Sequence, residues 1–136
     1  MARTRSFGSE RGSTAVESAL VGTVFLLLLV AIMEFGRLGF TYNSISFAAH
    51  RAARFAAVRG SASGHPATAA DVRAEAQSLV VALDTANLSV TTTWTPDNHP
   101  GSAVKIQVSY PFQTLLVPVS SKLMTLTTTS TQVITQ

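Results

Sequence analysis

The chain has 136 residues, of which 46% are hydrophobic and only 12% charged, and its formal net charge is +3. This length allows one small domain once any membrane segment is set aside, and the charged fraction is about half of the roughly 25% that soluble domains carry. Because the chain contains no cysteine, a disulfide framework, a thiolate zinc site and a cysteine nucleophile are excluded.

Residues 1–12 form a polar, basic leader. Three arginines against one glutamate give it a net charge of +2, whereas residues 13–136 carry a net charge of only +1. The positive charge therefore sets the orientation of a membrane segment rather than forming a nucleic-acid surface, because basic flanks stay on the cytoplasmic side. We predict a disordered cytoplasmic leader, a C-terminal portion across the membrane and no nucleic-acid partner.

The next feature is a long apolar run. Ser18 to Met33 contains no ionisable side chain over 16 residues, and Ala15 and Val16 extend the run across Glu17. A helix that spans a bilayer needs about 20 predominantly apolar residues, so the run is just long enough with its flanks. Residues 13–33 are therefore expected to form one transmembrane helix in contact with membrane lipid.

Residues 34–60 are expected to continue this helix as an amphipathic extension. Apolar residues recur there at spacings of three and four, which indicates a helix with one buried stripe. These residues are Leu38, Tyr42, Ile45, Ala49, Ala52 and Ala56, with Ala48 and Phe55 beside them. Arg37, Arg51 and Arg54 fall elsewhere on the helix surface, and we expect them to be solvated or to contact other subunits.

Gly60 begins a segment that contains glycine, serine and proline and is typical of a helix end. No proline precedes Pro66, so nothing stops the helix at the membrane edge. A continuous helix from Ser13 to Arg59 would be roughly 70 Å long at 1.5 Å per residue. Its outer half must therefore pack on something other than lipid.

Residues 61–136 predict a small α+β head. Thr68 or Asp71 would cap a short helix that extends to Leu83. Three strand-like runs follow. Side chains alternate in Leu88–Thr95 and Ala103–Tyr110, and Leu126–Thr135 is rich in threonine. Residues 95–101 form a turn between the first two runs. We expect a three-stranded antiparallel sheet with one helix over it. Because this core is small, the long N-terminal helix should help to cover the sheet.

Glu17 lies inside the apolar run. A charged side chain in a spanning helix costs about 2.5–3.5 kcal/mol at mid-bilayer on insertion scales, and it is usually paired or functional. One interpretation is that Glu17 snorkels into the lipid headgroups. The other starts from Gly12: a cut after this residue makes Ser13 the new N-terminus and Glu17 the fifth residue. The new amine, on the same or a neighbouring helix, is then a partner for the carboxylate.

A short basic leader, a glycine and an apolar helix with glutamate as its fifth mature residue resemble the N-terminal signals of type IV pilins. Residues 11–60 are similar to the TadE-like family, which comprises minor pseudopilins of the Flp/Tad (tight-adherence, type IVb) pilus. The stretches that carry this similarity are Arg11-Gly12, Ala15-Val16-Glu17, Ala19-Leu20-Val21, Glu34-Phe35-Gly36-Arg37 and Ala48-Ala49 to Arg54-Phe55-Ala56. The chain departs from the family at Ser18, where an aromatic residue is common, and at Gly22-Thr23, where proline is common.

The resemblance implies a non-enzymatic subunit without a cofactor. A prepilin peptidase would cut between Gly12 and Ser13, and Glu17 would pair with the amine of an adjacent subunit. That pairing would set the axial register, as one buried polar group does in a coiled coil. The implied partners are the peptidase, other pilin or pseudopilin subunits and the inner-membrane pilus machinery. The protein would lie in the bacterial inner membrane with a periplasmic head, act in pilus assembly and adhesion, and enter a surface pilus or prime it.

Taken by itself, the sequence contains no pattern that indicates an enzyme. The chain contains no G-x-S-x-G, P-loop or G-x-G-x-x-G motif, and its three histidines, His50, His65 and His99, lie in separate settings. We therefore predict no metal site and no catalysis. The alternative function is a single-pass, membrane-anchored periplasmic domain that binds a partner or a cell-wall polymer and is neither processed nor assembled. Gly12 and Glu17 would then be coincidental.

Overall fold

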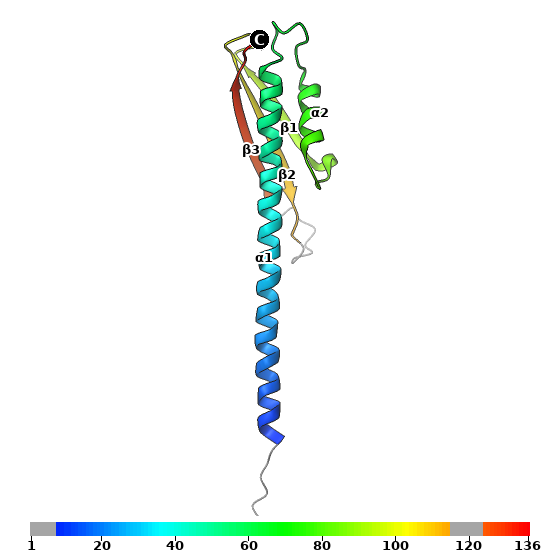
Figure 1. Ribbon diagram of the computed structural model, residues 1–136, viewed down its shortest axis with the longest axis vertical. Helices are drawn as coiled ribbons and strands as arrows, with labels where there is room; N and C mark the ends of the chain where they lie inside the picture. Colours follow the sequence, from blue (N-terminus) through cyan, green and yellow to red (C-terminus); the bar gives the residue numbers. More distant parts are fainter. Residues whose placement is uncertain (1–7, 115–123) are drawn as a thin grey trace, which may run out of the picture. The chain divides into compact units, whose positions relative to one another are not determined.

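The computed structural model describes residues 8–114 and 124–136. Within these ranges the elements are α1 (Gly8–Ala57), α2 (Ala69–Leu79), a short 3₁₀ helix (Thr85–Asn87), β1 (Ser89–Thr95), β2 (Ala103–Phe112) and β3 (Met124–Val133) (Figure 1). The predicted α+β class, with a long N-terminal helix, a short helix and a three-stranded antiparallel sheet, is confirmed. The chain divides after Gly36 into two compact units, called here the N-terminal unit and the head unit.

α1 is one helix across the predicted leader, span and extension. It begins at Gly8, so the expectation of a disordered leader is wrong for residues 8–12, while residues 1–7 lie outside the described residues. This stretch contains no proline. Its serine, glutamate and arginine each cost a helix less than about 0.7 kcal/mol, and its two glycines cost about 1 kcal/mol each. At the other end, the Arg59 N–H donates to the Ala56 carbonyl at 3.2 Å. This tighter turn ends the helix slightly before the expected position.

The sheet has the order β1-β2-β3, and both strand pairs are antiparallel. In β2 the side chains of Val104, Ile106 and Val108 are fully buried, and the register aligns Ile106 with Thr92 and Ser130. The opposite face is polar and carries Thr91, Thr93, Gln107, Thr127 and Thr129. The predicted alternation is therefore confirmed, although β3 begins and ends two residues earlier than expected.

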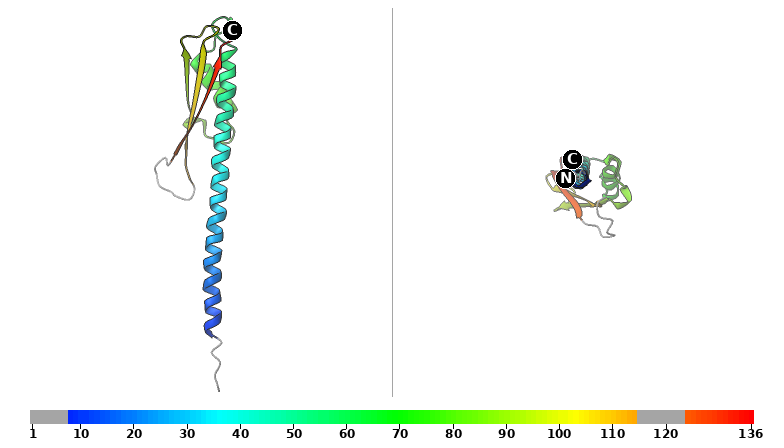
Figure 2. Two further views of the ribbon diagram at one scale, coloured as in Figure 1. Left: turned by 90° about the vertical axis from the view of Figure 1, so that its left-hand side faces the viewer. Right: turned by 90° about the horizontal axis from the view of Figure 1, so that it is seen from below.

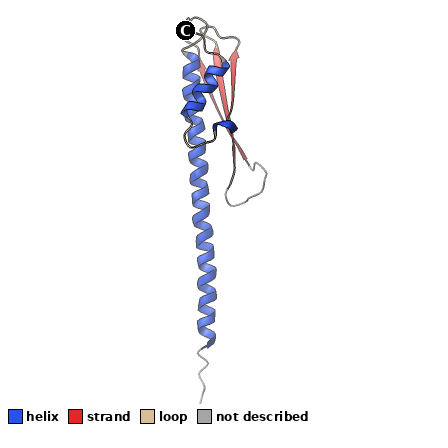
Figure 3. Cartoon of the chain, turned by 90° about the vertical axis from the view of Figure 1, so that its right-hand side faces the viewer, coloured by secondary structure: helices blue, strands red, loops and turns tan. Residues whose placement is uncertain are grey.

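α2 and the part of α1 in the head unit lie side by side on one face of the sheet (Figures 2 and 3). The buried stripe of this part of α1 consists almost wholly of alanine. Its members are Ile45, Ala48, Ala49, Ala52, Ala53, Ala56 and Ala57. Small side chains allow the helix backbone to approach the sheet at the close packing of protein interiors. The expectation that the long helix helps to cover the sheet is confirmed.

One member of the expected stripe is placed differently. Tyr42 is 48% exposed, whereas the neighbouring Thr41 is only 4% exposed. The Thr41 hydroxyl donates to the Arg37 carbonyl at 2.9 Å, so its burial leaves no unpaired donor. Both residues lie within the stripe by helical spacing, because Thr41 precedes Ala48 by seven residues and Tyr42 precedes Ala49 by seven. The structure nevertheless buries only Thr41.

α2 begins with a capping box that uses both predicted cap residues. The Thr68 hydroxyl accepts from the Asp71 N–H at 3.2 Å, and the Asp71 carboxylate accepts from the Thr68 N–H at 2.9 Å. This reciprocal pair satisfies two donors at the helix start. The helix ends at Leu79 rather than the expected Leu83, because the backbone of Val80 is extended. Leu83 packs against the core from the following turn.

Gly60 is buried where the end of α1 meets the C-terminal segment. A Cβ at this position would collide with the Gln136 carbonyl oxygen and with Cγ2 of Ile134. Nearby, the Thr135 N–H donates to the Ala57 carbonyl at 2.9 Å. Glycine is therefore required by the close approach of the C-terminal segment, in addition to its predicted place after the helix end.

Candidate functional site

The predicted processing residues, Gly12 and Ser13, lie within α1 and are both exposed. A Cβ at Gly12 would meet nothing within 4 Å, so packing does not require glycine here. Glycine is about 1 kcal/mol less favourable than alanine inside a helix. Gly12 therefore makes this turn of α1 easier to unwind, at the peptide bond where the cut is predicted.

Glu17 is exposed on α1. It lies beside a shallow hollow of about 490 Å³ along the helix, lined by Thr14, Glu17, Ser18, Val21, Gly22 and Phe25. Within residues 8–114 and 124–136, no side-chain hydrogen bond or ion pair engages the Glu17 carboxylate. The chain therefore places a carboxylate on an apolar helix and supplies no described partner for it.

The N-terminal unit leaves its apolar side chains uncovered. The large hydrophobic residues from Leu20 to Met33, Val30 apart, are 41–66% exposed. Among the described residues, α1 is the one helix long and apolar enough to cross a membrane, and its most apolar window is not buried in the protein. A helix that is hydrophobic on all sides requires an apolar environment. This pattern indicates single-pass membrane anchoring.

Arg37, the first residue of the head unit, contacts the end of β2. Its guanidinium carbon lies 5.4 Å from the centroid of the Phe112 ring, which is within cation–π range. Its Nη2 also donates to the Gln113 carbonyl at 3.5 Å, a long hydrogen bond. Arg37 thus packs against its own chain, and an additional contact with another subunit stays a prediction.

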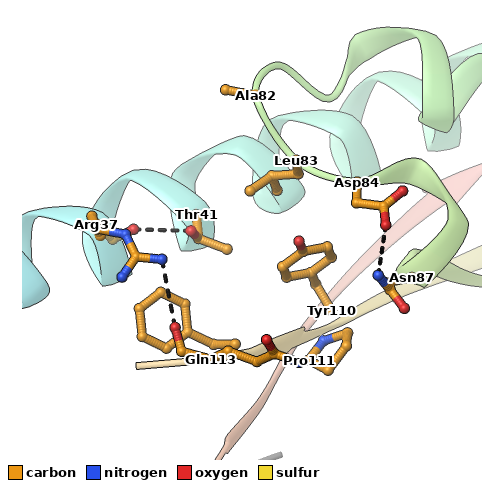
Figure 4. Close-up of a pocket in the computed structure, with 10 residues that line it drawn as sticks. Arg37, Thr41, Ala82, Leu83, Asp84, Asn87, Tyr110, Pro111 and Gln113 are labelled. Carbon is orange, nitrogen blue, oxygen red and sulfur yellow. Dashed lines mark hydrogen bonds between the residues drawn. The ribbon is translucent and has the colours of Figure 1, made fainter. Parts of the chain in front are cut away.

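Arg37 also lines a pocket of about 320 Å³ in the head unit. Residues of α1, of the α2–β1 connection and of β2 surround it, among them Thr41, Leu83, Asp84, Asn87, Tyr110 and Pro111 (Figure 4). The Asp84 carboxylate accepts from the Ala86 N–H at 3.0 Å and the Asn87 amide at 2.8 Å, so it stabilises the 3₁₀ helix. Sequence reasoning missed this pocket because three distant segments form it.

Arg51 and Arg54 are exposed on the side of α1 that faces away from the core. Within the part of the chain that the structure describes, neither side chain forms a hydrogen bond or an ion pair. The neighbouring His50 differs, because its Nδ1 lies 3.0 Å from the Ser130 hydroxyl, on a residue that is 4% exposed. This contact connects α1 to β3, and no local sequence signal indicates it.

In the loop after β1, Asp97 and His99 are separated by one residue, a spacing that is a weak pattern for a metal site. The Asp97 carboxylate accepts from the Ser102 hydroxyl at 2.6 Å and from the His99 N–H at 3.0 Å. These hydrogen bonds, that of Ser102 first, lower the pKa of Asp97. The carboxylate therefore stabilises the turn. Over the described ranges, no group of three or more His, Cys, Asp or Glu side chains is placed to hold a metal ion.

Residues 12–54, about a third of the chain, match the model of the TadE-like protein family. This is a TadE-like segment. The comparison with curated proteins gave no match, and neither did the comparison with solved structures. The TadE-like segment begins at Gly12 and ends at Arg54, so it contains Ser13, Glu17 and all three predicted helix-face arginines.

The TadE-like segment associates the chain with the Tad pilus, in which members of this family are generally structural rather than enzymatic. The predicted resemblance is confirmed over that segment. The match ends inside α1, so α2 and the sheet lie beyond it.

Proposed function

We propose that the chain is a non-enzymatic minor pseudopilin of the Tad pilus. Its leader lies in the cytoplasm, α1 spans the bacterial inner membrane, and the head unit lies in the periplasm. Prepilin peptidase removes the leader, and the mature subunit then acts with other pilus subunits in assembly and adhesion. The TadE-like segment and the exposed apolar side chains of the N-terminal unit support this proposal.

The observation that carries the proposal is the environment of Glu17. An unpaired charge costs about 2.5–3.5 kcal/mol at mid-bilayer, and the described residues provide no ion pair for Glu17. Two unit charges 4 Å apart gain about 4 kcal/mol at an effective dielectric constant of 20. An amine created at Ser13 of a neighbouring subunit would therefore offset the cost of placing the Glu17 carboxylate in the membrane. The same pairing would fix the axial register of two subunits.

The peptidase step requires the helix around Gly12 to open. Residues 8–12 are helical, and a glycine beside the cut lowers the free energy needed to unwind this turn. A leader with a net charge of +2 keeps the cut on the cytoplasmic face. Gly12 and Ser13 thus define the processing site, and Glu17 defines the subunit contact that processing creates.

The first experiment measures the intact mass and N-terminal sequence of the membrane-extracted chain, expressed with and without a prepilin peptidase. We expect a mature chain that starts at Ser13 only when the peptidase is present. Gly12→Val should block this product, with Ser9→Val as the matched control in the leader. A chain that keeps its leader in both samples would instead favour the unprocessed, membrane-anchored binding domain.

A second experiment tests the role of the Glu17 carboxylate separately from processing. Glu17→Ala should leave membrane insertion intact and abolish incorporation beside partner subunits, as measured by co-purification with the pilus fraction. Glu17→Asp keeps the charge and is the matched control. Normal incorporation of Glu17→Ala would contradict the pairing role.

A further inference from the structure

The side of α1 opposite its alanine stripe is uncovered by any described residue of the head unit. Phe40 and Phe47 are 52% and 54% exposed, and Arg51 and Arg54 beside them are also exposed. Their spacings of seven, four and three residues place all four on one side of the helix. We call these four residues the outer stripe of α1. Aromatic rings and arginines are the residue types enriched at protein interfaces.

α2 exposes a complementary surface. Ala70, Ala74 and Ser78 are exposed and recur every fourth residue, with Asp71 and Glu75 along one flank. We call these five residues the acidic face of α2. In the described ranges, the Glu75 carboxylate has no hydrogen bond or ion pair. Asp71 uses Oδ2 for its bonds to the cap residue, which leaves Oδ1 for another donor.

We propose that the outer stripe of α1 docks on the acidic face of α2 in a second copy of this chain. Arg51 pairs with Glu75 and Arg54 pairs with Asp71, so the two helices run antiparallel. Phe47, four residues before Arg51, then packs at the Ser78 end of the strip of small side chains. The inference rests on the proposed function, because it names one contact through which subunits of the pilus associate.

The charge distribution favours a second copy as the occupant. Residues 35–57 contain three arginines and no acidic residue, whereas the described residues after α1 contain four acidic and three basic side chains. The two arginines are separated by a rise of roughly 4.5 Å along α1, and the two carboxylates by roughly 6 Å along α2. The spacing of the two charged pairs therefore agrees to within about 2 Å.

The outer stripe faces away from the sheet of its own chain, and on the acidic face Ala70, Asp71, Ala74 and Ser78 are exposed while Glu75 is half-buried. Another molecule can therefore reach both surfaces. Because the two surfaces differ, their contact is heterologous. A heterologous contact that does not close into a ring generates an open helical filament. This geometry agrees with a subunit that is added repeatedly along a fibre.

Cysteine cross-linking tests the contact directly, because the natural chain contains no cysteine. Full-length Phe47→Cys and Ser78→Cys chains, whose altered positions face each other in this pairing, are mixed in vesicles of phosphatidylethanolamine and phosphatidylglycerol and then oxidised. We expect a disulfide-linked dimer several-fold above that of Phe47→Cys mixed with Thr93→Cys, an exposed position on the opposite face of the sheet. Equal dimer yields in the two mixtures would overturn the inference.

Charge exchange gives a second measurement. Arg51→Glu in the Phe47→Cys chain should lower the cross-linked yield several-fold, and Glu75→Lys in the Ser78→Cys chain should do the same. Combining the two altered chains should restore the yield. A yield that is not restored would overturn the inference. If Arg51→Glu also weakens binding of the chain to the anionic vesicles, the outer stripe binds lipid instead.

The outcomes separate this inference from the proposed function. A chain that is never cut after Gly12 but still forms the 47–78 disulfide would support the contact and contradict the processing. A chain that starts at Ser13 and associates through Glu17 without the disulfide would overturn the contact alone.

Discussion

The two parts of α1 place their apolar side chains in different surroundings. In the N-terminal unit, large residues such as Leu26 and Leu27 are 62% and 59% exposed, whereas the head unit buries a stripe of alanines completely. Lipid is fluid and adapts to side chains of any volume, so the first part needs only to be apolar. A sheet is rigid and close-packed, so the second part needs small side chains at defined positions. The comparison shows that side-chain size, rather than hydrophobicity, distinguishes the two environments.

Ile106→Ala should produce the largest effect, and only in the head unit. Ile106 is fully buried in the middle strand, and such truncations cost about 2–5 kcal/mol through lost transfer energy and the cavity left behind. Trp94, the single tryptophan, packs against this core and reports unfolding of the full chain in detergent micelles. Lys105→Ala, an exposed neighbour on β2, is the matched control. A transition unchanged by Ile106→Ala would contradict the assigned core.

Leu27→Arg should act only on the membrane segment. Arginine at mid-bilayer costs about 2.5–3.5 kcal/mol on insertion scales, so the inserted fraction should fall in a membrane-insertion assay. The Trp94 unfolding transition of the micelle-bound chain should stay unchanged. Leu27→Ala keeps the site uncharged and controls for side-chain loss. Reduced stability of the head in Leu27→Arg would break the distinction between the two units.

Gly60→Ala should destabilise the head by about 1–3 kcal/mol, the usual cost of overpacking a filled site. The added methyl group meets Ile134 and the carbonyl of the C-terminal Gln136, and the end of the chain can move away only by losing its contacts. Thermal unfolding followed by Trp94 measures the effect. Gly64→Ala, at a glycine with φ of 76° and no atom near its Cβ, distinguishes backbone strain from the clash.

The smallest expected effect is a loss of stability at acid pH, which again affects only the head unit. Hydrogen bonds lower the pKa of Asp71 and Asp97 below the ordinary 3.8, so in acid the folded state binds fewer protons than the unfolded state. The stabilisation is complete above the ordinary pKa and is lost as the pH falls through the lowered values. Denaturation midpoints between pH 7 and pH 2 should decline below about pH 4. Asp71→Asn with Asp97→Asn should flatten this decline, and an equally steep decline would contradict the assignment.

The sequence predicted most features that depend on local patterns. The uncharged run from Ser18 to Met33 indicated the apolar helix, and the alternation of Val104, Ile106 and Val108 indicated a strand with one buried side. Thr68 and Asp71 marked the start of α2. Each signal is local because the spacing of side chains along the backbone determines which of them share a face.

Other features depend on which segments meet in the folded chain. The sequence could not distinguish Thr41 from Tyr42 as the buried residue, and it gave no sign of the hydrogen bond between His50 and Ser130. The pocket beside Arg37 also combines distant segments. Local propensity describes one element at a time, whereas burial is decided by the outline of the surface that covers it.

For this protein, the sequence by itself determined the order of the elements, the apolar segment and the position of Glu17 relative to Gly12. These properties follow from backbone periodicity and from the free energy of placing charge in an apolar medium. Only the tertiary structure decided that α1 and α2 share one face of the sheet, leaving the outer stripe and the acidic face uncovered. A helix has several apolar or small-residue sides, and close packing against a particular neighbour selects one of them.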